Sequence, residues 1–471
     1  MSIERLFREK IEMDPTIFRA YDIRGIYGQD ITVLDATKIG AAFAEIIGSG
    51  TISVGWDVRL SSQPLAYAFM AGAAASGLRV MDIGLAPTPM LYFSVANESL
   101  DGGAMVTASH NPKEYNGMKF CRQRALSFSY ETGIKEIAKR CLSPSFEFSN
   151  SFGKVELRQN LKDEYLNYLT RDVDQRCSMK VLVEVGNGCC AIVGEALSRI
   201  GCTVSLMHPD PDGNFPNGTV NPAREETVKE LEEEVVRQKA DIGVALDVDG
   251  DRVCFIDENG LWTQGDVAFA IIAEPILERE RNAEVVADIR SSRAVIERIK
   301  ELGGRIRFSR VGHSYIANAV IDSDAKIGGE LSGHIYIHDR YYGYDDGIYA
   351  AIRMIETLSQ KGETLSEAKS KLRKMASSPE IRIGFPDELK FMAVMHIKEA
   401  LKDQGIEFNE LDGVRADFER GWFSIRASNT EPCLVLRMEG EDSSSLDDMT
   451  SMAYGLVNEA GRKLGHKPSP L

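Results

Sequence analysis

Residues 107–112, Thr-Ala-Ser-His-Asn-Pro, place a serine hydroxyl where it could react with a ligand. The apolar residues 103–106 before them predict a short buried strand, and Pro112 prevents that strand from continuing. Open α/β folds bind their ligands beyond the ends of such strands. We therefore expect Ser109 to lie at the rim of a sheet, exposed to a bound substrate.

A second loop, Asp-Val-Asp-Gly-Asp-Arg at 247–252, carries three alternating carboxylates. Alternate side chains of an extended chain share one side, and a slight curl brings Asp247, Asp249 and Asp251 to one point. Three hard oxygen donors suit Mg²⁺ or Ca²⁺ rather than a thiol-seeking metal. The loop is therefore a candidate metal site.

Three other interpretations fit parts of this acidic loop. An EF-hand would have Glu258 at its twelfth position, but Arg252 occupies position six, where the turn needs glycine, and the flanking residues predict strands. A phosphatase-type DxD motif has threonine or valine where Asp251 stands. A solvated acidic turn is the third interpretation, because short motifs discriminate loosely.

Two more loops carry polar side chains suited to sugar and phosphate. Residues 328–334, Gly-Gly-Glu-Leu-Ser-Gly-His, offer Glu330 and Ser332 to neighbouring hydroxyls, although an ordinary turn would have a similar composition. Residues 426–432, Arg-Ala-Ser-Asn-Thr-Glu-Pro, combine the Arg426 guanidinium with short polar side chains that could surround a phosphate. A polar hairpin turn is the alternative for this last loop.

The elements that must position these loops alternate between helix and strand over the first two-thirds of the chain. Such repeated units predict sheets with helices on both faces. The predicted helices are 68–75, 89–96, one starting near 225 and one capped by Ser291 or Ser292, and the predicted strands are 80–83, 242–246 and 285–289. After residue 379 the pattern changes to two helices, 388–403 and 446–463, around strands near 414–418, 422–427 and 433–438.

Breaks at 143–153, 257–266 and 377–379 divide this pattern into four parts. The predicted fold class is α/β, with three tandem mixed α/β domains, a smaller C-terminal α+β domain and the active site in a central cleft. The predicted domains are 1–155 with the serine loop, 156–262 with the acidic loop, 263–376 with the Glu330 loop, and 377–471 with the Arg426 loop.

Composition narrows the function. The 471 residues carry a formal net charge of −16, which argues against nucleic acid as a partner. Apolar runs stay short of the ~20 residues that span a bilayer, so no membrane partner is expected. Residues 1–10 lack the apolar stretch of a signal peptide, and the eight cysteines lack metal-ligand spacing. The expected location is the cytoplasm.

Taken together and in this order, the four loops resemble those of the α-D-phosphohexomutase superfamily. The resemblance begins at residues 18–25, Phe-Arg-Ala-Tyr-Asp-Ile-Arg-Gly, covers essentially the whole chain, and is strongest to the bifunctional phosphomannomutase/phosphoglucomutase group. It implies reversible phosphoryl transfer between positions 1 and 6 of mannose and/or glucose phosphate. It also implies a phosphoserine enzyme, a hexose-1,6-bisphosphate intermediate that serves as activator, and a monomer or small homo-oligomer whose partner is a small sugar phosphate.

The resemblance also implies roles for single residues. Ser109 corresponds to the phosphoserine, and together with Asp247, Asp249 and Asp251 it would bind Mg²⁺. The other residues with an implied catalytic role are His110, Lys119, Arg252 and His313. The residues with an implied substrate-binding role are Tyr21, Arg24, Arg290, Glu330, Ser332, His334, Arg426, Ser428, Asn429 and Thr430.

Ordinary structural roles compete for three of these residues. His110 could hold its loop by hydrogen bonds, His313 could cap the helix that follows it, and Lys119 could be an exposed lysine on a strand. Arg290 stands where a lysine is expected in the most similar relatives, which keeps the charge but changes its geometry.

Leu331 bears on the choice of sugar. Bifunctional mannose/glucose enzymes usually have methionine here and phosphoglucosamine mutases glutamine, so the apolar leucine favours neutral hexose phosphates. Phosphoglucosamine mutase activity is the alternative, followed by a non-catalytic sugar-phosphate binding protein. A metal-dependent hydrolase would have the same motifs but would release phosphate, because the difference depends on exclusion of water.

Overall fold

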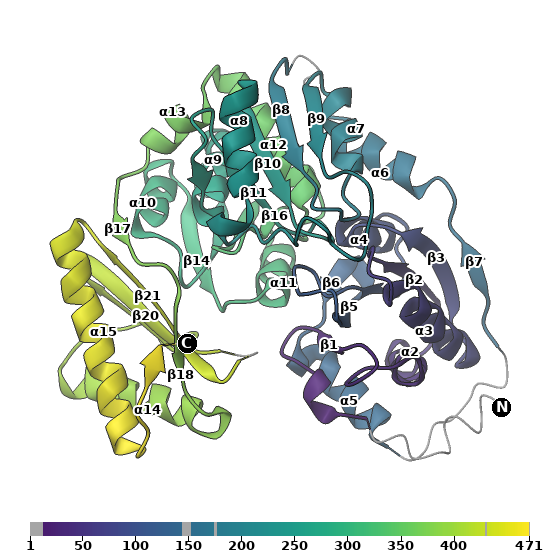
Figure 1. Cartoon of the computed structure of the whole chain (residues 1–471), viewed down its shortest axis with the longest axis horizontal. Helices are drawn as coiled ribbons and strands as arrows, with labels where there is room; N and C mark the ends of the chain where they lie inside the picture. The colour runs from purple at the N-terminus through teal and green to yellow at the C-terminus, as the bar shows by residue number, and fades with distance from the viewer. Residues whose placement is uncertain (1–12, 144–151, 174–176, 429–430, 471) are drawn as a thin grey trace.

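A computed structural model describes residues 13–143, 152–173, 177–428 and 431–470, which form four sheets in succession along the chain (Figure 1). The first three sheets are mixed and the fourth is antiparallel, so the predicted fold class is confirmed. The predicted domain limits stay a prediction. No helix in the described ranges is long and apolar enough to cross a membrane.

The first sheet has its helices on both faces. In the central strand β4 (Gly102–Val106), Ala104 and Val106 pack into the core under α2 (Val33–Ile47) and α3 (Ser62–Ala75). Met105 packs into the core under α4 (Thr88–Asn97). The strands, in sheet order, are β1 (Ile23–Ile26), β5 (Tyr115–Arg122), β4 (Gly102–Val106), β2 (Thr51–Trp56), β3 (Arg79–Leu85) and β7 (Val155–Leu157), with β6 (Leu126–Ser127) beside β5. The helices are α2 (Val33–Ile47), α3 (Ser62–Ala75), α4 (Thr88–Asn97) and α5 (Lys135–Cys141).

The second and third sheets continue the alternation of strand and helix. The second contains β12 (Trp262–Thr263), β11 (Val253–Ile256), β10 (Ile242–Leu246), β8 (Lys180–Glu184) and β9 (Thr203–Met207), with helices α6 (Leu161–Thr170), α7 (Ile192–Arg199) and α8 (Lys229–Gln238). The third contains β14 (Arg305–Ser309), β13 (Glu284–Asp288), β15 (Ile327–Gly329) and β16 (Ile335–Ile337), with helices α9 (Gly265–Arg279), α10 (Arg293–Glu301), α11 (His313–Ser323), α12 (Gly347–Lys361) and α13 (Leu365–Ser370).

The fourth sheet carries two long helices, α14 (Asp387–Asp403) and α15 (Ser443–Lys463). Its strands are β19 (Val414–Phe418), β20 (Gly421–Ala427), β21 (Cys433–Gly440), β18 (Ile381–Gly384) and β22 (Ser469–Pro470), with β17 (Ala376–Ser377) beside β21.

The predicted elements agree with these bounds to within a few residues, with two corrections. The helix predicted at 68–75 already begins at Ser62, as α3. The prediction for 242–246 coincides with β10, and Ser292 caps α10 by accepting a hydrogen bond from Ala294 N. The helix expected from residue 225 begins only at Lys229, after a 3-10 turn at Glu225–Thr227. Val228 between them has φ −123°, outside the helical range, which separates the turn from the helix.

Two arginines, the buried Arg415 and the partly exposed Arg293, connect the fourth sheet to the third. Arg415 Nη1 donates to the carbonyl oxygens of Ile289 and Ser291, each at 2.8 Å, and its guanidinium stacks 3.9 Å from the Trp422 ring. Arg293 at the start of α10 donates to Phe418 O and Gly421 O. These bonds join the strand ends of the third sheet to β19 and β20.

Asp346 at the start of α12 makes folding sensitive to pH. Its carboxylate accepts hydrogen bonds from Tyr165, Tyr341 and the Tyr349 backbone, yet burial raises the pKa of Asp346 from 3.8 to about 6. Between these values the folded chain binds more protons, so its stability falls as pH rises, by up to about 3 kcal/mol. We expect urea unfolding to show a smaller loss of stability from about pH 4 to 7 in Asp346→Asn than in the wild type.

Candidate functional site

Ser109 lies just beyond β4, as predicted, but it is 4% exposed rather than open to solvent. Its backbone has φ +50°, a left-handed conformation that non-glycine residues rarely adopt. Thr107 Oγ1 supports the turn by accepting from Ser109 N and donating to Asp57. The Ser109 hydroxyl donates to Asp247 Oδ2 at 2.6 Å and lies 2.8 Å from Arg252 Nη2. The serine and acidic loops therefore meet at this hydroxyl.

Arg59 holds the serine loop in shape, and sequence analysis missed it. Its guanidinium is fully buried, pairs with Asp57, and donates to the carbonyl oxygens of Ser109, Asn111, Pro112 and Tyr115. Five N–H donors in a fixed fork are well suited to bind several carbonyls at once. Nothing in the sequence marks this arginine, which follows β2 in the order Asp-Val-Arg at 57–59.

The three aspartates of the acidic loop converge as predicted. Their carboxylates are fully buried, and one oxygen from each lies within 4.8 Å of the others. Asp249 Oδ2 accepts a hydrogen bond from Thr88 Oγ1, which links the acidic loop to the first residue of α4. Glu258, the would-be twelfth EF-hand ligand, instead accepts from Ser366. This removes the EF-hand interpretation.

Lys119 is buried among these carboxylates, which overturns the alternative of an exposed strand lysine. It lies on β5, pairs with Asp251, and its Nζ donates to Asp249 Oδ2 at 2.7 Å. Burial lowers the pKa of this ammonium, but Asp249 and Asp251 outweigh burial and raise it well above 10.5. Lys119 is therefore a fixed positive charge inside the site.

Arg252 supplies a second buried cation beside the serine. Its Nε and Nη2 donate to Asp247 Oδ2 at 3.0 and 2.8 Å, and Nη2 also contacts His110 Nδ1. Burial and the charge of Arg252 lower the pKa of His110 well below its usual value, so this imidazole is neutral. Burial raises the pKa of Asp247 to about 7. His110 contacts both Ser109 and Arg252, so it organises the loop as well as lining the site.

The Glu330 loop of the third sheet presents a buried carboxylate. Glu330 Oε1 accepts from Tyr336 OH at 2.6 Å, and Oε2 accepts from Ser332 Oγ at 3.2 Å. Arg290 Nη2 donates to Asp288 Oδ2 at 2.8 Å and lies 3.6 Å from Glu330, while Nε also donates to Asp288 and Nη1 donates to Glu380. Arg290 is thus linked to the loop's carboxylate, and Glu380 connects it to the segment leading into the fourth sheet.

Two histidines join this loop to the acidic loop. His334 Nδ1 lies 2.7 Å from Asp345 Oδ2 and 4.0 Å from Asp251 Oδ1. Burial opposes its charge, but Asp251 and Asp345 raise the pKa of His334 to about 9. The His313 ring stacks 5.8 Å from His334, and burial together with Lys119 lowers the pKa of His313 well below 6.5. One imidazole is therefore charged and its neighbour neutral.

His313 does not cap α11, contrary to one alternative. The N-cap is Gly312 at φ +134°, and His313 is the first helical residue. A Cβ on Gly312 would lie 2.4 Å from the Tyr21 ring, so only glycine permits this approach. Tyr21 OH donates to Val311 O at 2.7 Å, and Arg24 Nη1 donates to Asn111 Oδ1. The N-terminal segment thus reaches both the α11 start and the serine loop.

The Arg426 loop follows β20 in the fourth sheet. Arg426 Nε donates to Asp412 Oδ2 at 3.0 Å, and the same oxygen accepts from Val311 N at 3.1 Å. Ser428 Oγ accepts from Glu431 N. Asn429 and Thr430, also expected here, lie outside the described residues. The arginine is therefore connected through Asp412 to the residues just before His313.

The residues fit a divalent cation at the acidic loop. Asp249 Oδ1 and Asp251 Oδ1 are buried and lack a hydrogen-bond donor among the described residues. Buried carboxylate oxygens need a donor or a metal, and a cluster of hard oxygens suits Mg²⁺. The cluster of Asp247, Asp249 and Asp251 can therefore hold a metal ion.

The serine hydroxyl lies beside three carboxylates and two buried cations, a set of groups that can position and neutralise a phosphoryl group. Four family models cover the chain in order. They are described as phosphoglucomutase/phosphomannomutase alpha/beta/alpha domains I, II and III, at residues 15–147, 163–260 and 264–375, and the C-terminal domain at 380–454. The chain belongs to the phosphoglucomutase/phosphomannomutase family.

Comparisons with individual proteins support the same family. The phosphomannomutase/phosphoglucomutase of Pseudomonas putida is 35% identical over 437 residues, which cover 92% of this chain and 93% of that protein. The phosphomannomutase of Escherichia coli K12 is 32% identical over 455 residues, which cover 94% of this chain and 99% of that protein. A crystal structure of a phosphoglucomutase/phosphomannomutase family protein from Burkholderia thailandensis matches with a TM-score of 0.89 at 29% identity, covering 97% of this chain and 99% of that one. The expected resemblance is confirmed.

Proposed function

We propose that this enzyme interconverts the 1- and 6-phosphates of mannose and glucose through a phosphoserine at Ser109. The observation that carries the proposal is the hydroxyl of Ser109, which lies 2.6 Å from Asp247 Oδ2 and 2.8 Å from Arg252 Nη2. Phosphoryl transfer depends mainly on positioning and on neutralisation of charge, and this hydroxyl has both around it.

In the proposed first step, the bond between phosphorus and Ser109 Oγ breaks and a bond to a sugar hydroxyl forms. The sugar hydroxyl's proton needs an acceptor, and the neutral imidazole of His313 suits this role better than the charged Lys119. Arg252 and Lys119 offset the negative charge of the phosphoryl group. The 1,6-bisphosphate then reverses its orientation and returns its other phosphoryl group to Ser109.

Mg²⁺ and a hexose-1,6-bisphosphate activator belong to the proposal. Asp247, Asp249, Asp251 and Ser109 would hold the ion, which supplies further charge neutralisation at the transferring group. Glu330 and Ser332 would bind the sugar hydroxyls, with Tyr21, Arg24, Arg290 and His334 lining the site. We further infer a cytoplasmic enzyme that acts on a small sugar phosphate as a monomer or small homo-oligomer.

Arg426, Ser428, Asn429 and Thr430 would bind the phosphate that does not react. We expect Arg426→Ala to lower kcat/KM by roughly 10²-fold, mainly through a higher KM, because it removes a charge-assisted bond to that phosphate. Arg420→Ala, an exposed arginine of the same domain, is the matched control and should leave both constants unchanged. Equal kinetics for the two variants would contradict the phosphate-binding role.

Steady-state kinetics with mannose-1-phosphate, glucose-1-phosphate and glucosamine-1-phosphate test the proposal. With Mg²⁺ and a trace of bisphosphate, we expect similar kcat/KM for the first two sugars and a much lower value for the third. Leu331 carries this expectation, since its buried apolar side chain has no amide to offer an amino group. Preference for the amino sugar would indicate a phosphoglucosamine mutase, and stoichiometric release of inorganic phosphate would indicate a hydrolase.

A further inference from the structure

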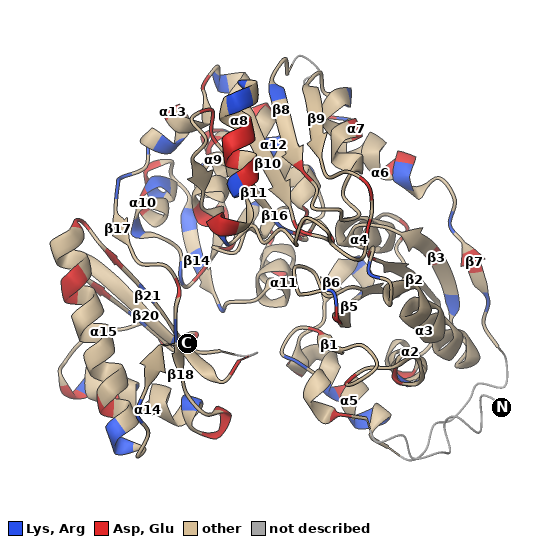
Figure 2. Cartoon of the chain, viewed as in Figure 1, with Lys and Arg blue, Asp and Glu red and all other residues tan. Residues whose placement is uncertain are grey.

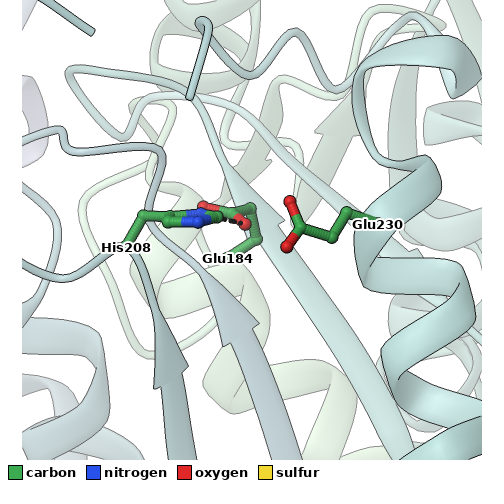
Figure 3. Close-up of side chains that lie close together, drawn as sticks. All are labelled: Glu184, His208 and Glu230. Atoms are coloured by element: carbon green, nitrogen blue, oxygen red, sulfur yellow. Dashed lines mark hydrogen bonds and ion pairs between the residues drawn. The ribbon is translucent and has the colours of Figure 1, made fainter. Parts of the chain in front are cut away.

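A second group of metal-type ligands lies on the second sheet, outside the site described above. Glu184 ends β8, His208 follows β9, and Glu230 lies in the first turn of α8. One ligand atom from each lies within 4.8 Å of the others. Glu230 extends from α8, a helix rich in acidic residues (Figure 2), toward the Glu184–His208 pair (Figure 3).

The Glu184–His208 pair has the geometry of two ligands on one ion. His208 Nδ1 and Glu184 Oε2 form a hydrogen bond of 2.9 Å, a separation close to the ~3 Å between neighbouring ligands at ordinary metal–ligand distances. Gly186 N donates to the other carboxylate oxygen, Glu184 Oε1, at 2.6 Å. This bond orients the carboxylate of Glu184, a residue that is 5% exposed, so that its other oxygen faces the histidine.

The charges of the side chains around this pocket favour the binding of a cation. Besides Glu184, His208 and Glu230, only uncharged residues such as Asn217 and Thr227 line the pocket between these side chains. None of these residues is a lysine or arginine. The nearest cation in sequence, Lys229, pairs instead with Glu225 and Glu232. Two carboxylates therefore converge on an imidazole without a basic side chain in the lining.

The size of the pocket limits what it can hold. Its volume of about 30 Å³ admits one ion with a water molecule, and it is far too small for a sugar phosphate. One nitrogen and two carboxylate oxygens form a mixed donor set, which favours Zn²⁺ and similar transition metals over Mg²⁺. The cluster of Asp247, Asp249 and Asp251 has only oxygen donors and differs in this respect.

We propose that Glu184, His208 and Glu230 form a second metal site that binds one divalent transition-metal ion of the Zn²⁺ class. The bound ion would cross-link α8 to the ends of β8 and β9. Because the segment 217–220 lines the same pocket, the ion would also hold that segment in place.

The segment beside this pocket reaches the catalytic loops. Thr219 Oγ1 donates to His110 O at 3.1 Å, and Asn221 Oδ1 accepts from Arg252 Nη1 at 3.2 Å. Occupancy of the second site would therefore stabilise a segment that touches both the serine loop and the acidic loop. The proposed role is positional, since none of the three ligands contacts Ser109 or the three aspartates in the described chain.

Zn²⁺ titration of the whole enzyme against a chromophoric chelator, with millimolar Mg²⁺ present, tests this proposal. We expect the wild type to bind one equivalent of Zn²⁺ that Glu230→Gln and His208→Gln bind at least about tenfold more weakly. Glu233→Gln, an exposed glutamate on the same helix, is the matched control and should bind as the wild type does. Glu230 is itself exposed, so its variant should fold even if the histidine variant does not.

Two further readouts complete the test. Zn²⁺ should raise the melting temperature of the wild type and of Glu233→Gln but not of Glu230→Gln, and a Zn²⁺-soaked crystal should show an anomalous peak between the three side chains. Equal Zn²⁺ binding by all variants, or a peak only at the aspartate cluster, would overturn the proposal. If His208 merely pairs with the carboxylates, no Zn²⁺ will bind at this site. That result would also overturn the proposal.

Discussion

Ser109→Ala is expected to abolish mutase turnover, with kcat lowered by at least roughly 10⁴-fold. The reason is chemical: the proposed cycle stores the phosphoryl group on this hydroxyl, and alanine offers no oxygen to receive it. The two neighbours of the hydroxyl, Asp247 at 2.6 Å and Arg252 at 2.8 Å, are not expected to replace it, because the Asp247 carboxylate is paired with Arg252 and would hold the metal ion. Coupled assays with glucose-1-phosphate and bisphosphate measure the loss.

Intact mass spectrometry separates this effect from misfolding. The wild type incubated with glucose-1,6-bisphosphate should gain a phosphoryl group that Ser109→Ala does not gain. The control Ser444→Ala, an exposed serine near the start of α15, should keep both the phosphorylation and the activity. Near-normal turnover by Ser109→Ala, in a protein with the wild-type circular dichroism spectrum, would refute the phosphoserine mechanism.

The loops of the site could be predicted from sequence because each is contiguous in the chain. The order of strand and short polar loop is a local signal, and it located Ser109 and the three aspartates correctly at strand ends. That Ser109 would touch Asp247 across 138 residues came only from the resemblance. Spacing alone does not determine which strand ends of two different sheets lie together.

The residues that support these loops could not be predicted from sequence. Arg59 binds four carbonyls of the serine loop, and Tyr336 donates to Glu330, yet neither residue has a distinctive neighbourhood in the sequence. Lys119 illustrates the same limit. A lysine on a strand is exposed by default, and only its pairing with two carboxylates of the next domain makes burial favourable.

The position of His208 in a cluster of possible metal ligands could not be predicted from sequence either. Its two partners lie 24 and 22 positions away along the chain, on a strand end and a helix. Only the parallel pairing of β8 with β9 brings the ends of these strands together. A separated cluster of this kind becomes visible only once the sheet is assembled.

Asp249→Asn is expected to lower kcat by roughly 10²–10³-fold and to raise the Mg²⁺ concentration needed for half-maximal activity by at least about tenfold. Asp249 is fully buried, and its Oδ1 lacks a hydrogen-bond donor in the described structure, so that oxygen is available to a metal. Its Oδ2 already binds Thr88 and Lys119. The amide of asparagine keeps the shape but removes the charge that attracts the ion.

Metal withdrawal distinguishes this role from a purely structural one. Dialysis of the wild type against EDTA should abolish turnover, and Mg²⁺ alone should restore it, whereas Asp249→Asn should recover only at higher Mg²⁺. Asp448→Asn, an exposed aspartate on α15, should respond as the wild type does. If Asp249→Asn lost activity with an unchanged Mg²⁺ dependence, its partnership with Lys119 would be the relevant interaction. Activity that survived EDTA would remove the metal from the mechanism, leaving Lys119 and Arg252 to neutralise the phosphoryl group.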